Sequence, residues 1–77
     1  MDYTSRITTD PDVMLGKPII VGTRITVELI LRKLSEGLTI DEVHAAYDHI
    51  TKEDIYAALT YASDLIANEE VIIAGNR

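Results

Sequence analysis

The fold is decided by residues 39–67, which read TIDEVHAAYDHITKEDIYAALTYASDLIA. Two capping boxes, Thr39 with Glu42 and Thr51 with Asp54, predict two helix starts, because each threonine hydroxyl accepts the backbone amide three residues later. Apolar residues at helical spacing predict the buried faces. These residues are Ile40, Val43 and Tyr47 in the first helix, and Ile55, Ala58, Leu59, Ala62, Leu65 and Ile66 in the second. A short helix, a tight turn at residues 48–50 and a longer helix are typical of a helix-turn-helix.

A further helix is predicted upstream, from a stripe with the spacing i, i+3, i+4, i+7. Its members are Val27, Ile30, Leu31 and Leu34. Thr26 is the expected N-cap, and Gly37 is the expected left-handed residue after the helix. Small residues predict close approach of the last two helices, and they are Ala45, Ala46, Ala57, Ala58 and Ala62. The interpretation is a mainly α fold with a three-helix, homeodomain-like helix-turn-helix core, the alternative being a plain three-helix bundle.

Residues 1–26 predict a short N-terminal β arm with turns. β-branched runs favour a pairing of Arg6–Thr9 with Lys17–Val21, and Pro and Gly residues interrupt the chain between them. Two strands are not stable alone in water, so the arm must lie on the helices or on a partner. The predicted division is an arm at 1–26, a core at 27–67 and a tail at 68–77.

Length and composition restrict the size of the core and the means by which the fold can be stabilised. A single domain of 77 residues without cysteine has a small core and no disulfides. We therefore expect a homodimer, in which the arm lies over a neighbour. The sequence has neither an apolar run of 18 residues nor a signal peptide, so no membrane association and a cytoplasmic location are expected.

The charge is unevenly distributed along the chain. Residues 1–33 hold five Lys and Arg against four Asp and Glu, whereas residues 34–77 hold two against nine. The net charge of −6 discourages nucleic-acid binding, because phosphates repel an acidic surface. Contact with DNA, if made, is expected to be weak and to depend on the N-terminal half.

Several runs of sequence resemble the domain-of-unknown-function family 433 (DUF433). They are Arg6–Thr8, Gly16–Ile20, Gly22–Val27, Gly37–Thr39 and Thr51–Leu59, so the resemblance extends from residue 6 to about residue 67. It implies a prokaryotic origin and a homeodomain-like helix-turn-helix preceded by a β arm. Members are similar to VapB-type antitoxins of toxin-antitoxin systems, which pair with PIN-domain ribonuclease toxins. The resemblance therefore implies an antitoxin-like protein that binds a toxin and, as a second ligand, DNA.

The residues expected to contact DNA form two groups. Lys52, Tyr56 and Thr60 are the outward positions of the predicted recognition helix, but Glu53 and Asp54 beside them suit the helix dipole and repel phosphate. Lys17, Arg24 and Lys33 supply the positive charge of the N-terminal half. The turn at residues 22–24 is a phosphate-binding candidate, and a purely structural role is the favoured interpretation.

Catalytic and metal chemistry are not predicted. His44 and His49 are five residues apart and do not share a helix face as an i, i+4 pair would. No serine has a histidine and an acidic residue placed to activate it, so we expect neither an enzyme nor a cofactor. A dimeric protein-interaction module without DNA binding remains the alternative to the antitoxin-like function.

Overall fold

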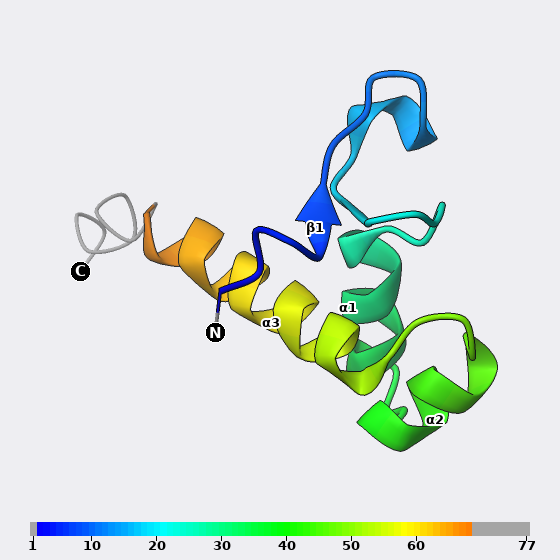
Figure 1. Ribbon diagram of the computed structural model, residues 1–77. Coiled ribbons are helices and arrows are strands. Elements are labelled where there is room, and N and C mark those ends of the chain that lie inside the picture. The colour runs from blue at the N-terminus through cyan, green and yellow to red at the C-terminus, as the bar shows by residue number, and fades with distance from the viewer. Residues whose placement is uncertain (1, 69–77) are drawn as a thin grey trace.

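The computed structural model describes residues 2–68, which form three helices and a small two-stranded sheet (Figure 1). The helices are α1 (Val27–Ser35), α2 (Ile40–Ala46) and α3 (Lys52–Ala67). The strands are β1 (Ile7–Thr8) and β2 (Ile19–Ile20), separated by a 3-10 turn, η1 (Met14–Gly16). The fold is mainly α with an N-terminal β arm, as predicted. Of the predicted tail, only Asn68 belongs to the described residues, as the C-cap of α3.

The predicted helix starts are confirmed by their hydrogen bonds. Thr26 Oγ1 accepts from the backbone amide of Leu29 at 2.9 Å and caps α1. At α2, the Thr39 hydroxyl accepts from the Glu42 amide at 3.1 Å, and the Glu42 carboxylate accepts from the Thr39 amide at 2.8 Å. These bonds satisfy amides that the first helical turn leaves without a partner.

The arm is shorter than predicted because the chain turns back soon after β2. The strands are antiparallel and pair Ile7 with Ile20 and Thr8 with Ile19. Gly22 has a φ of +78°, which only glycine adopts readily, and the turn brings the Ile20 amide to the Ile25 carbonyl at 2.9 Å. Ile7, Ile20 and Ile25 are buried against the helices, so the arm completes the core within one chain.

The core is aliphatic and centres on four fully buried side chains, Ile30, Val43, Ile50 and Ile55. One comes from each helix and one from the turn between α2 and α3. Each loses its whole apolar surface to the interior, and this burial is the main force that holds the three helices together. Ala57 and Ala58 are also completely buried, and their small side chains let neighbouring elements approach α3 closely.

The predicted apolar face of α3 is wrong in its C-terminal half. Leu65 is 52% exposed and Ile66 is 62% exposed, Leu59 is only partly buried, and Ala57, outside the predicted stripe, is buried. The reason is the length of α3, which continues past α1, so that no helix of residues 2–68 covers its last turns (Figure 1). Ala45 and Ala46 are exposed as well, so the small residues of α2 do not mediate helix packing as expected.

Candidate functional site

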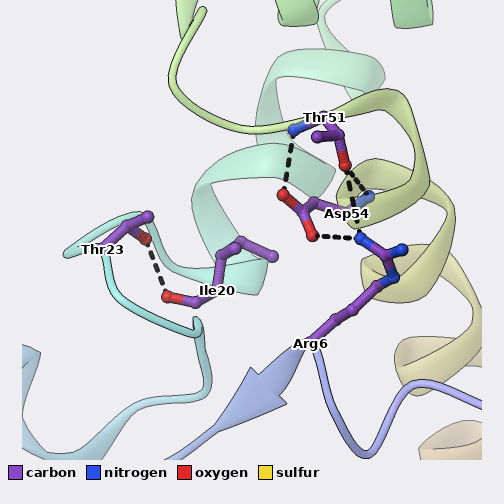
Figure 2. Close-up of polar contacts among 5 residues, drawn as sticks. All are labelled: Arg6, Ile20, Thr23, Thr51 and Asp54. Atoms are coloured by element: carbon purple, nitrogen blue, oxygen red, sulfur yellow. Dashed lines mark hydrogen bonds and ion pairs between the residues drawn. The ribbon is translucent and has the colours of Figure 1, made fainter.

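The start of α3 joins the arm to the helix-turn-helix (Figure 2). Asp54 Oδ2 accepts a hydrogen bond from the Thr51 backbone amide at 2.9 Å. Arg6 Nη1 donates a hydrogen bond to Asp54 Oδ1 at 3.0 Å. The Thr51 hydroxyl accepts from the Asp54 amide at 3.1 Å, which completes the predicted capping box. Sequence reasoning did not single out Arg6, because 48 positions separate it from Asp54. This cluster is an architectural feature that fixes the angle of the arm on α3.

The predicted recognition residues lie together on the solvent side of α3. Lys52, Tyr56 and Thr60 follow one another at intervals of four residues, and Tyr56 is 46% exposed. Lys52 forms an ion pair with Asp41 of α2, and their hydrogen bond lowers the pKa of the Asp41 carboxyl and raises the pKa of Lys52. The Thr60 hydroxyl donates to the Tyr56 carbonyl at 3.0 Å. Two of the three polar groups are thus already engaged within the protein.

Lys17 and Arg24 lie together at the far end of the arm. Both line a hollow of about 330 Å³, which they share with Asp12 and residues of the η1 turn. The Lys17 ammonium donates to Glu28 at 2.8 Å, and this hydrogen bond lowers the pKa of the Glu28 carboxyl. Arg24 Nη2 lies 3.8 Å from the sulfur of Met14. The two cations line one hollow, as a phosphate-binding site requires. Asp12 lines the same hollow and Glu28 pairs with Lys17, and these carboxylates repel a phosphate.

The turn before Arg24 has the structural role that the sequence favoured. The Thr23 hydroxyl donates to the Ile20 carbonyl at 2.9 Å (Figure 2). The same oxygen accepts from the Ile25 amide at 3.0 Å. Gly22 and Thr23 therefore close a backbone turn in which the Thr23 and Ile25 amides already have acceptors within the protein.

Lys33 is separate from the other candidate cations, at the end of α1, where it lies 3.6 Å from Glu36. Arg32, one residue earlier, pairs with Glu28 at 3.9 Å. Among residues 2–68, every Lys and Arg except Arg24 forms an ion pair with a carboxylate of that same stretch. The folded chain thus neutralises most of its own positive charge and leaves a surplus of carboxylates on its surface.

An apolar groove with a volume of about 450 Å³ lies between α1 and α3. Its walls come from one face of each helix and from the residue before β2. They are formed by Pro18, Val27, Glu28, Leu31, Arg32, Ser35, Tyr61, Ala62 and Leu65. Tyr61 is held by an edge-on contact with Tyr3, with ring centroids 5.3 Å apart. Sequence reasoning missed this groove because it took Leu65 as a core residue.

The histidines do not gather with other ligands. His44 is partly buried on α2, and His49 is exposed in the following turn. Within residues 2–68, no group of three or more His, Asp and Glu side chains is placed to hold a metal ion. None of the helices in this range combines the length and apolarity needed to cross a membrane.

Comparisons with known proteins agree with this architecture. The family model described as "Protein of unknown function (DUF433)" matches residues 7–62. The crystal structure of a DUF433 member protein from Anabaena variabilis is similar, with a TM-score of 0.78 and 29% sequence identity. The similarity covers 94% of this chain and 71% of that one. No curated protein matches the chain. With most of its length matched by the family model, the chain belongs to the DUF433 family.

Proposed function

We propose that this protein is an antitoxin-like, acidic binding module whose partner is a PIN-domain-type ribonuclease. A ribonuclease must attract RNA phosphates, so the surface that binds the RNA backbone is expected to carry a positive potential. An acidic protein of the right shape covers such a surface by charge complementarity. In the helix-turn-helix, carboxylates are exposed on α2, in the following turn and on α3.

The neutralisation of the cations is the observation that carries this proposal. Lys52 is paired with Asp41, and Arg6 is paired with Asp54, so the positive charges of these two side chains are already compensated. Glu42, Asp48 and Glu53 remain exposed on α2, in the turn and on the first turn of α3. We refer to these three carboxylates as the acidic face. A basic partner gains attraction from them without breaking an ion pair.

The proposal is tested with the protein encoded beside this chain's own gene. We expect a PIN-domain ribonuclease there, a complex with it in size-exclusion chromatography, and loss of its ribonuclease activity on addition of the chain. Neutralising two carboxylates of the acidic face, in Asp48→Asn/Glu53→Gln, should weaken the complex and slow its association. The effect should shrink as salt increases, because screening removes the charge attraction.

A charge-matched control separates local from global effects. Asp10→Asn/Asp12→Asn removes the same number of carboxylates from the arm end, and it should leave the complex unchanged. Equal weakening by both double variants would show that net charge matters and the acidic face does not. A folded chain that neither binds nor inhibits the neighbouring protein would contradict the proposal and favour a dimeric interaction module instead.

DNA is the second candidate ligand, favoured by the position of Lys52, Tyr56 and Thr60 on the solvent side of α3. Binding requires Lys52 to exchange Asp41 for a phosphate or a base edge, which keeps the affinity of a single chain low. A homodimer would bring two such helices to successive major grooves if they lay about 34 Å apart. Lys17, Arg24 and Lys33 would then add phosphate contacts from the N-terminal half.

The DNA proposal is tested by a salt-titrated binding assay with DNA from upstream of the gene. Arg24→Ala/Lys33→Ala should weaken binding to all sequences equally, while Lys52→Ala should change the sequence preference. Absence of binding at 50 mM salt, with and without the neighbouring protein, would exclude DNA as a ligand.

A further inference from the structure

The tip of the arm exposes a large apolar side chain on a strained backbone. Leu15 is 93% exposed, and the η1 turn that carries it lies at the end of the arm, away from α2 and α3 (Figure 1). Met14 and Leu15 have φ values of +50° and +60°, in the left-handed region that residues other than glycine rarely adopt. Backbone strain of this kind is found mainly where a protein contacts a ligand or a partner. Strain and exposure together indicate that Leu15 contacts another molecule.

A cation without a carboxylate partner lies beside this tip. Arg24 and Leu15 line the same hollow, and Arg24 Nη2 lies 3.8 Å from the sulfur of Met14. Within residues 2–68, Arg24 is the one Lys or Arg that forms no ion pair with a carboxylate of that stretch. A surface complementary to the tip therefore has an apolar hollow with a carboxylate at its edge.

The α1/α3 groove of a second copy has both features. Leu31, Ala62 and Leu65 contribute apolar walls, and Glu28 lines the groove with 54% of its side chain exposed. Glu28 Oε1 accepts a hydrogen bond from Lys17 at 2.8 Å. Glu28 Oε2 lies 3.9 Å from Arg32, which is longer than a hydrogen bond, so this oxygen can accept from a further donor.

The tip and the groove also lie close together along one chain. Pro18 lines the groove and follows Leu15 by three positions, so their Cα atoms are at most about 11 Å apart. A twofold interface makes each contact twice, so a short arm is enough for both tips to reach the opposite grooves. We propose that two copies form a twofold dimer in which Leu15 of each enters the α1/α3 groove of the other and Arg24 pairs with Glu28 of the other copy. This surface does not include the acidic face, so the inference stands independently of the proposed partner.

Charge exchange, followed by sedimentation equilibrium, tests the pairing. Arg24→Glu would place carboxylates against each other in the dimer, and Glu28→Lys would place cations against each other. Each variant alone should therefore be monomeric at a concentration where the native chain is a dimer. An equimolar mixture of the two should recover the dimer, because each altered side chain then meets the opposite charge. Lys33→Glu changes the net charge as Arg24→Glu does, from a position outside the arm and the groove, and should remain dimeric.

A disulfide tests the position of the tip directly. The protein has no cysteine, so Leu15→Cys/Ala62→Cys provides one thiol at the tip and one in the groove. In a glutathione redox buffer, this variant should give a covalent dimer on a non-reducing gel. Leu15→Cys/Ala46→Cys has its second thiol on the exposed side of α2, outside the groove, and should run as a monomer.

The inference is overturned if the native chain sediments as a monomer. A dimer that persists in Arg24→Glu, or equal cross-linking of the two cysteine variants, would assign the dimer to another surface. Circular dichroism checks that Glu28→Lys is folded, since this change removes the Lys17 ion pair. Leu15→Asp supports the test without that risk, because its exposed side chain packs little within its own chain, and a folded variant that stays dimeric would also contradict the inference.

Discussion

Arg6 and Asp54, 48 positions apart in the chain, meet at 3.0 Å and join the β arm to the N-terminal cap of α3. Asp54 is the more buried partner, with 13% of its side chain exposed against 36% for Arg6. A single carboxylate thus serves both a local helix cap and a long-range ion pair. The arm has only two short strands, so this contact matters more to its position than a surface ion pair ordinarily does.

We expect the two roles of Asp54 to separate in a double-mutant cycle. Asp54→Ala should cost about 1–2 kcal/mol of unfolding free energy, because a cap and an ion pair are both lost. Arg6→Met should cost about 0.5–1 kcal/mol, since the cap remains. Urea unfolding of both single variants and the double variant measures the coupling. Additivity within about 0.3 kcal/mol would show that the ion pair contributes nothing.

The core prediction concerns Ile55, which is completely buried. Ile55→Ala should cost about 2–5 kcal/mol, and Ile55→Val about 0.5–1.5 kcal/mol. The valine variant is needed because a domain of this size has only about 4–12 kcal/mol of total stability. Leu59→Ala should cost less than Ile55→Ala, because Leu59 is only partly buried. Ile66→Val on the exposed end of α3 is the matched control and should stay within about 0.5 kcal/mol of the native protein. Equal losses for Ile55→Val and Ile66→Val would contradict the observed burial.

The Asp41–Lys52 pair predicts a defined pH dependence. The hydrogen bond from Lys52 holds the pKa of Asp41 below its ordinary value of 3.8 in the folded state. A depressed carboxyl pKa stabilises the fold above the unfolded value and loses this effect as pH falls through the folded value, so the change lies below about pH 4. NMR titration of the Asp41 carboxyl carbon should show an upward shift of its midpoint in Lys52→Gln. Glu28, whose pKa is lowered by Lys17, is the internal control and should not change; an unaltered Asp41 midpoint would contradict the assignment.

The homodimer expected from the small core remains a prediction, to be checked by sedimentation equilibrium. We expect twice the chain mass of 8.5 kDa at micromolar concentration. Leu15 is 93% exposed and Val21 is 48% exposed, both at the arm, so contact through the arm would bury them. Leu15→Asp/Val21→Asp should shift the equilibrium toward monomer, while Ile66→Asp should not. A native chain that sediments at 8.5 kDa would exclude the dimer.

The helix starts could be predicted from sequence because each cap is made within one turn. Thr26 reaches Leu29, Thr39 reaches Glu42 and Thr51 reaches Asp54, and all three pairs are three positions apart. A hydrogen bond over that distance depends on local backbone geometry and on residue type alone. The outer side of the candidate recognition helix could also be predicted, because helical periodicity determines the face on which each residue lies.

The sequence alone therefore determined the order of the elements, the start of each helix and the presence of an N-terminal arm. Only the tertiary structure decided how far the core extends along α3, where Ala57 is buried and Leu65 is not. Helical periodicity defines a face but not the length over which another element covers it. Tertiary structure also decided which carboxylate each cation meets, as in Arg6 with Asp54 and Lys17 with Glu28. Such pairs form between segments that only folding brings together, and they determine how much positive charge the surface retains.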